Sequence, residues 1–147
     1  MVTRFLWDRR GYSLTWAAAF LAILLVPLLL LGIEIGRWEH ARGELYKAAD
    51  LAALAGAHEV DIAHFRETGE VLLLPSALDV AQRYVAANTG YLTRNGIVAH
   101  VAGIAVDQAL RQVEVTVVAD ISSLFPAWAP RVVIRGRGTA EVRGMVR

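Results

Sequence analysis

The first candidates for acid–base or nucleophilic chemistry in this chain of 147 residues are its four histidines and four serines. His58 and Glu59 begin like a helical zinc-protease motif, in which two histidines stand at positions i and i+4. The next histidine is His64, six residues on, so the two rings would not share a helical face. No serine lies within G-x-S-x-G, and neither a P-loop nor G-x-G-x-x-G is present. The residues therefore favour a non-enzymatic protein with no metal ion and no cofactor.

The bulk composition excludes further classes of function. A net charge of +1 gives no general attraction to nucleic acid, so we expect no nucleic-acid partner. Cysteine is absent, which excludes disulfides and thiolate chemistry. Hydrophobic residues make up 56% of the chain, and much of that share lies in one uncharged run near the N-terminus.

Glu34 is the charged residue that directly follows this apolar run. Two interpretations of its role stay open. Charges in or near a membrane usually find a partner, so Glu34 could meet a cation of a neighbouring subunit. It could equally be a headgroup-level carboxylate beside Arg37, which follows at a three-residue helical step.

The run that precedes Glu34 has the length of a membrane span. Residues 14–33 carry no charge, and a hydrocarbon core about 30 Å thick needs ~20 apolar residues at 1.5 Å per residue. A cleaved secretory signal is the alternative. The apolar core of such a signal covers only ~7 to 15 residues and is followed by a small-x-small cleavage site, whereas the run here is longer and is followed by Glu34, Arg37 and Trp38. The sequence therefore predicts a leader at residues 1–10, a transmembrane helix at residues 11–35 and one domain at residues 36–147.

Lysine and arginine counts near the two ends of the span are similar, so the positive-inside rule decides little. The short segment before the span and the long one after it favour a cytoplasmic N-terminus and an extracytoplasmic domain. We expect a single-pass protein of the cytoplasmic (inner) membrane, in contact with the lipid bilayer.

Small residues along the span are candidates for contacts with other membrane helices. Gly32 and Gly36 form a small-x-x-x-small pair, which lets helix backbones approach closely. The residues expected to make such contacts are Ala17, Ala18, Ala22, Gly32 and Gly36. Other membrane proteins are the expected partners, and a homo-oligomer is one form that these contacts allow. Pro27 removes a backbone hydrogen bond, and both a deliberate kink and simple tolerance stay open.

The residues after the span predict an α+β domain. Residues 35–57 read as helix, since Trp38, Ala41 and Leu45 recur at steps of three and four. Small side chains on the same face would let a sheet pack close to this helix. The residues predicted to make this helix–sheet packing are Ala48, Ala52 and Ala55. A second helix of about fourteen residues opens at Pro75, with an apolar stripe predicted at Leu78, Ala81, and Tyr84 or Val85.

Alternating apolar and polar residues predict about three antiparallel strands, at residues 97–106, 112–121 and 131–143. A sheet this small cannot stand alone, so its apolar face should lie on the two helices. Between the last two strands, residues 124–130 form a loop rich in proline and aromatic residues. It could be a core plug or an exposed contact.

Arginines mark the predicted polar face of the last strand, at Arg135, Arg137 and Arg143. They could meet lipid headgroups or acidic partners. The alternative is a solvated face whose cations pair across strands with Glu114 and Glu141.

Several motifs run along the chain in an order typical of one family. They are Arg10-Gly11, the apolar run with Pro27, Gly32-Ile33-Glu34-Ile35-Gly36-Arg37, the alanine-rich run from Ala48 to Ala57, Ala86-Ala87-Asn88, Val113 to Val117, Leu124-Phe125, and Arg137 to Val142. With these motifs, most of the chain resembles the TadE/TadG-like proteins of tight-adherence (Flp) pilus assembly.

The resemblance implies a pilin-like fold and a role similar to that of a minor pilin or pseudopilin. TadE-like members resemble prepilins, in which a glycine is followed at the fifth position by glutamate and a membrane peptidase cleaves after the glycine. Here Gly11 is followed at that position by Trp16. The departure puts cleavage after Gly11 in doubt and favours the uncleaved behaviour of TadG-like members.

The leading hypothesis is a non-enzymatic, membrane-anchored component of Flp pilus assembly that acts through lateral helix contacts and contacts of its outer domain. Its partners would be other pilus-assembly components. The alternative is a single-span accessory or structural subunit of another membrane complex, for example an energy-transducing one.

Overall fold

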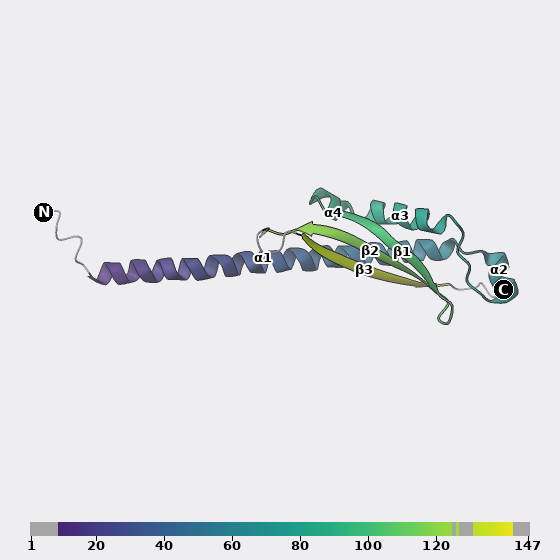
Figure 1. Ribbon diagram of the computed structural model, residues 1–147, viewed down its shortest axis with the longest axis horizontal. Helices are drawn as coiled ribbons and strands as arrows, with labels where there is room; N and C mark the ends of the chain where they lie inside the picture. Colours follow the sequence, from purple (N-terminus) through teal and green to yellow (C-terminus); the bar gives the residue numbers. More distant parts are fainter. Residues whose placement is uncertain (1–8, 125, 127–130, 143–147) are drawn as a thin grey trace. The chain divides into compact units, whose positions relative to one another are not determined.

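The computed structural model describes residues 9–124, 126 and 131–142, and it has the α+β class that the sequence predicts. The elements follow one another in the order drawn in Figure 1: α1 (Arg9–His58), α2 (Ile62–Thr68), α3 (Ala77–Asn88), α4 (Gly90–Arg94), β1 (Val98–Asp107), β2 (Gln112–Ser122) and β3 (Arg131–Glu141). The chain forms two compact units, Met1–Arg37 and Trp38–Arg147. The first unit holds the apolar part of α1, and the second holds the rest of the chain.

The sheet of the second unit is antiparallel, in the strand order β1-β2-β3. The central strand β2 pairs with β3 from Gln112↔Glu141 to Ser122↔Arg131 without a break in register. The pairing of β1 with β2 shifts between Val101 and Gly103, which marks a bulge. All three predicted strands are confirmed, with ends that differ by one or two residues. The predicted end of the last strand, Arg143, lies outside the described residues.

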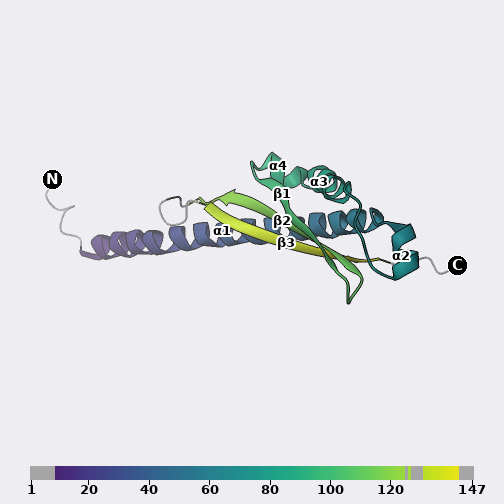
Figure 2. The same ribbon diagram turned by 45° about the vertical axis from the view of Figure 1, so that its right-hand side comes forward.

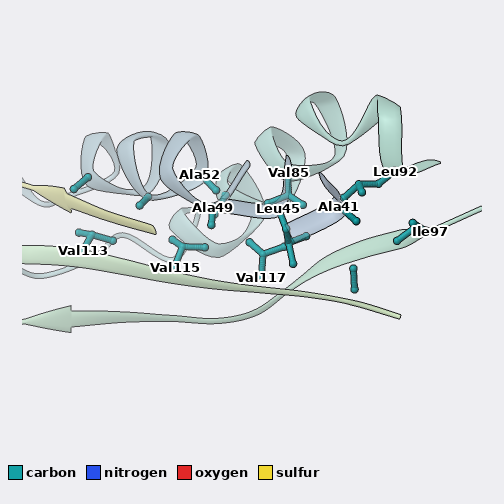
Figure 3. Close-up of a cluster of buried hydrophobic side chains, with 14 of the residues drawn as sticks. Ala41, Leu45, Ala49, Ala52, Val85, Leu92, Ile97, Val113, Val115 and Val117 are labelled. Atoms are coloured by element: carbon teal, nitrogen blue, oxygen red, sulfur yellow. The ribbon is translucent and has the colours of Figure 1, made fainter. Parts of the chain in front are cut away.

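The core lies on one side of this sheet, because β2 turns alternate residues to opposite faces. Its odd-numbered residues Val113, Val115 and Val117 are fully buried and belong to a single apolar cluster with residues of α1, α3 and α4. Figure 3 shows Leu45 of α1 and Val85 of α3 on the same side of the strands as these valines. The second unit is thus a two-layer structure of helices on a sheet.

The segment of α1 in the second unit buries a face built largely of alanine. Ala48 and Ala52 have no exposed surface, and Ala55 is 6% exposed. Ala49 and Ala53 are equally buried and widen this face. Small side chains along a helix allow the strands beneath it to come close.

Two glycines of β3 make the closest approach to α1. A Cβ atom at Gly136 would lie 2.8 Å from the carbonyl oxygen of Leu45, and one at Gly138 would lie 2.2 Å from the carbonyl carbon of Ala49. These distances are shorter than any side chain tolerates, so only glycine fits at these positions. Because two residues along β3 correspond to four along α1, the strand and the helix run in the same direction.

The second predicted helix is confirmed as α3, with Ser76 at its N-terminal cap. Its buried residues are Ala77, Ala81 and Val85, whereas Leu78 is 50% exposed. The predicted stripe is therefore wrong at Leu78, because α3 buries the neighbouring Ala77 instead. The α3 helix packs on β1 in Figures 1 and 2, and the side-chain oxygen of Gln82 accepts a 2.9 Å hydrogen bond from Val101 N.

The residues between α1 and α3 form a short helix and a single bridge. Asp61 caps α2 by accepting a 3.0 Å hydrogen bond from the backbone N–H of His64. Val60 and Leu73 form an isolated antiparallel bridge. Of the predicted aromatic loop at residues 124–130, only Leu124 and Pro126 lie within the described residues, and both are exposed.

Candidate functional site

The residues first considered for chemistry are engaged in local structure. Ser76 Oγ donates a 2.6 Å hydrogen bond to Glu59 Oε2, and His64 Nε2 lies 3.8 Å from Glu70 Oε2. His58 is exposed at the end of α1. No group of three or more His, Asp or Glu side chains that could hold a metal ion occurs in the described part of the chain. The Ser76–Glu59 pair is exposed, and neither contact joins a serine to a histidine.

The feature that stands out instead is the apolar part of α1. Residues 13–33 are all exposed, although the run contains large leucine, isoleucine and phenylalanine side chains. In the window that qualifies as a membrane span, only 6% of the residues are buried, whereas the core helix of a soluble domain would be mostly buried. A helix that is apolar all round and uncovered matches a membrane environment. The segment is long and apolar enough to cross a bilayer once.

The α1 helix continues through Pro27. Proline has no N–H to give to the carbonyl of Ile23, four residues earlier, so that carbonyl loses its usual helical donor. In a membrane, neighbouring helices or local adjustments can satisfy such a group. The residue therefore places one polar backbone atom within an otherwise apolar run.

One face of the apolar segment and its extension is lined by glycine. A Cβ atom placed at Gly32, Gly36 or Gly43 would meet nothing within 4 Å. The predicted contact residues Ala17, Ala18 and Ala22 are likewise exposed. Nothing in the described part of the chain requires glycine at these helix positions, and all five predicted contact residues are exposed.

Glu34 differs from its neighbours because it is only 1% exposed. Arg37 Nη1 donates a 3.0 Å hydrogen bond to Glu34 Oε2, which is the three-residue helical pair that the spacing allows. Steps of four, three and four residues lead from Glu34 to Trp38, Ala41 and Leu45. Of these, Ala41 and Leu45 belong to the core of the second unit, and Trp38 packs against it. A contact of Glu34 with a neighbouring subunit stays a prediction.

Beyond this pair, the exposed side of α1 carries solvent-facing pairs. Lys47 Nζ donates a 2.8 Å hydrogen bond to Glu44 Oε1, and this bond lowers the pKa of the Glu44 carboxyl. Arg42 donates a hydrogen bond to the Tyr46 hydroxyl, which raises the pKa of the guanidinium. Exposed pairs of this kind contribute little to stability. They keep the start of the second unit hydrated just beyond the apolar run.

Gly136 and Gly138, the two residues that fix how closely α1 and the sheet pack, were not predicted from the sequence. A signal was present. Glycine is unfavourable inside a strand and often marks close approach of another backbone, and here two glycines stand two residues apart on one face.

Comparison with known families gives one match. Residues 11–59 match the family described as putative Flp pilus-assembly TadE/G-like, and this segment is about a third of the chain. The match begins at Gly11 and covers the apolar segment together with the alanine-rich extension of α1. The resemblance stated from the sequence is confirmed over these residues. No curated protein and no solved structure matches the chain.

Proposed function

We propose that this protein is a non-enzymatic, membrane-anchored component of Flp pilus assembly. The observation that carries the proposal is the coincidence of two features in α1. The residues that match the pilus-assembly family include an apolar run that is exposed on all sides. A family match that covers the helix suited to cross a bilayer supports a role for this protein in pilus assembly as an anchored component.

The topology that we propose has the N-terminus in the cytoplasm and residues 36–147 outside it. The anchor lies in the cytoplasmic membrane. Gly11 is followed at the fifth position by Trp16 in place of a glutamate, so the leader remains attached. N-terminal sequencing of the native protein tests this, since cleavage would leave a chain that begins at Tyr12.

The mechanism that we propose is assembly through lateral contacts of the anchor and contacts of the outer domain. Other membrane helices approach α1 along Ala17, Ala18, Ala22, Gly32 and Gly36. Small residues favour such contacts because, without a hydrophobic driving force in lipid, association depends on close packing of backbones. The open space around Gly32 and Gly36 supports this interpretation.

Replacing both glycines by leucine, Gly32→Leu with Gly36→Leu, is expected to reduce recovery of partner proteins in mild detergent about tenfold. Two bulky side chains would hold a neighbouring helix away, while nothing within the chain is disturbed, because both positions are open. The measurement is quantitative mass spectrometry of the proteins that copurify with the tagged full chain.

The matched control is Ala19→Leu, a small-to-large change at an exposed position of the same helix that is not among the proposed contacts. It should leave recovery unchanged. Equal recovery with all variants would refute the glycine contacts. Recovery of a stoichiometric energy-transducing complex in place of pilus-assembly components would refute the pilus role and favour an accessory subunit.

A further inference from the structure

The second unit has an end that lies where α1 leaves the apolar segment, and several elements meet there. Because β3 runs with α1, its first residue is at this end: Arg131 precedes Gly136 by five residues, about 17 Å of extended strand. Ser122 pairs with Arg131, so the end of β2 lies there too. The unit thus presents a face made of strand ends beside the Trp38 end of its helix.

The α4 helix belongs to the same end. The rings of Tyr91 in α4 and His40 in α1 meet edge to face, with centroids 4.5 Å apart. Contacts between α4 and β1 bring the start of β1, at Val98, beside them. Val98 pairs with Asp120 near the end of β2, which agrees with this placement.

The charges of this end are mainly positive. We call it the basic end and define it by Arg42, Arg94, Arg131 and Arg135, all of which are exposed. Glu39 acts electrostatically on Arg42, and Asp120 pairs with Val133, between Arg131 and Arg135 of β3. In the described part of the chain no ion pair involves Arg94, Arg131 or Arg135. Arginine side chains left without a carboxylate can take an anionic partner.

Among the described residues, carboxylates outnumber the two arginines, Arg66 and Arg111, at the opposite end of the unit. Its carboxylates lie after the end of α1, in the β1–β2 turn and at the end of β3: Glu59, Asp61, Glu67, Glu70, Asp107 and Glu141. The side chain of Gln108 in the turn exchanges hydrogen bonds with both backbone groups of Val71, which ties these segments together. The positive charge is therefore concentrated at the end next to the anchor.

Apolar side chains are exposed between the arginines of the basic end. Val98 is 72% exposed, Val133 58%, Leu124 48% and Tyr91 37%. Tyrosine is enriched at the level of lipid headgroups, where its ring can lie in the interface while its hydroxyl stays hydrated. Cations mixed with exposed apolar and tyrosine side chains suit an interface between lipid and water.

Chain continuity limits how far the basic end can be from the bilayer. The uncharged run ends at Ile33, and Trp38 follows five residues later in the same helix, about 7.5 Å along its axis. The headgroup layer on each side of the hydrocarbon is about 5 to 7 Å thick. With residues 14–33 in the bilayer, Trp38, the first residue of the second unit, therefore lies at or just above the headgroups.

We propose that the basic end binds the anionic headgroups of the membrane in which α1 is anchored, with Arg94 and Arg131 as its principal contacts. The inference rests on the proposed membrane anchoring and goes beyond it, because an anchor alone would not require contact between the domain and the lipid. Three observations together fit an anionic lipid surface: arginines without a carboxylate partner, apolar side chains exposed between them, and the short length of α1 between the apolar run and Trp38.

The test uses the absence of cysteine, since each added cysteine gives one labelling site. The full chain carries a fluorophore at Val98→Cys or at Leu110→Cys, is reconstituted in vesicles, and is probed with a quencher attached to lipid headgroups. Leu110 is the matched control, because it is 61% exposed and lies in the turn at the opposite end of β1. We expect stronger quenching at Val98, and more of it when phosphatidylglycerol is added to phosphatidylcholine.

Neutralising arginines of the basic end should abolish the effect of phosphatidylglycerol on the quenching at Val98. Each cation near an anionic surface raises the ratio of headgroup-bound to unbound domain about fivefold. Arg94→Gln with Arg131→Gln should therefore lower this ratio about 25-fold. Arg66→Gln with Arg83→Gln, which lie away from the basic end, should change nothing. About 1 M salt, where the Debye length falls to about 3 Å, should weaken the Val98 quenching.

The outcomes separate the two proposals. Quenching at Val98 that is independent of phosphatidylglycerol, or unchanged by the Arg94 and Arg131 substitutions, would overturn the headgroup contact while the anchor stands. Such independence is also the outcome that an acidic protein partner would give. Extraction of the unlabelled full chain by alkaline carbonate would refute the anchor itself, and the headgroup contact with it.

Discussion

Gly138→Ala is expected to lower the free energy of unfolding of the second unit by about 3 kcal/mol. The added methyl group would lie 2.2 Å from the carbonyl carbon and 2.3 Å from the carbonyl oxygen of Ala49. Both atoms belong to the backbone of α1, so no side chain can turn away to make room. Denaturant unfolding of the full chain in a mild non-ionic detergent, followed by loss of the β-sheet circular dichroism signal, measures the effect.

Two other glycines of the sheet give matched comparisons. At Gly136 the nearest atom to an added Cβ is the Leu45 carbonyl oxygen at 2.8 Å, so Gly136→Ala should cost less than Gly138→Ala. At Gly103 nothing lies within 4 Å, and alanine there should leave stability unchanged or raise it by about 0.5 kcal/mol. Equal stability of all three variants would contradict the close packing of α1 on β3.

A second comparison separates backbone contact from side-chain crowding. Adding Ala49→Gly to Gly138→Ala should not restore stability, because the clash is with the Ala49 backbone and not with its methyl group. Restored stability would show that the side chains of α1, and not its main chain, limit the approach. The double variant thus tests the specific geometry and not only the importance of Gly138.

The same contact shows how far the sequence could lead. The alanine-rich run and the alternation in the last strand predicted a helix packed closely on a sheet, and the fold class is confirmed. The register was not predictable, because periodicity says which face of β3 is buried but not which residue of α1 lies opposite. Gly136 and Gly138 carried that information, and an alternation pattern treats glycine as neutral. Only the tertiary fold shows that the backbone of α1, at Leu45 and Ala49, lies against these glycines.

In α3, the error at Leu78 has a similar cause. Helical periodicity was assigned by following the larger apolar residues, whereas the helix turns Ala77, Ala81 and Val85 inward. Neighbouring residues of a helix point about 100° apart. In a short helix, the apolar pattern therefore does not determine whether Ala77 or Leu78 is buried. Leu78 remains half exposed.

The candidate site was predictable from the sequence only where it lies within one continuous segment of the chain. Length and the absence of charge predicted the apolar helix, and the structure leaves it uncovered. The arginines of the basic end lie on α1, α4 and β3, so their common location depends on the tertiary fold. Of these, only Arg135 was singled out from the sequence. The pairing of Glu34 with Arg37 was predictable from their three-residue spacing, whereas the burial of Glu34 was not.

The largest expected effect comes from placing acids in the middle of the apolar segment. Leu21→Asp with Leu24→Asp should make membrane insertion less favourable by about 6 kcal/mol, since each Leu-to-Asp change costs about 3 kcal/mol at the centre of a span. Both leucines are about half exposed, at 53% and 47%, so the change removes no contact within the chain. The wild-type protein should stay in the membrane pellet after alkaline carbonate, and the variant should be released.

The matched control applies the same chemical change, at the same spacing, further along the same helix. Leu51 and Leu54 are 41% and 53% exposed, so Leu51→Asp with Leu54→Asp should leave membrane retention unchanged. Flotation in a density gradient distinguishes the outcomes, because aggregated chains sink whereas membrane-bound chains float. If the Leu21 and Leu24 variant floats like the wild type, residues 14–33 are not the anchor. If both variants are released equally, general loss of apolar surface explains retention better than a span does.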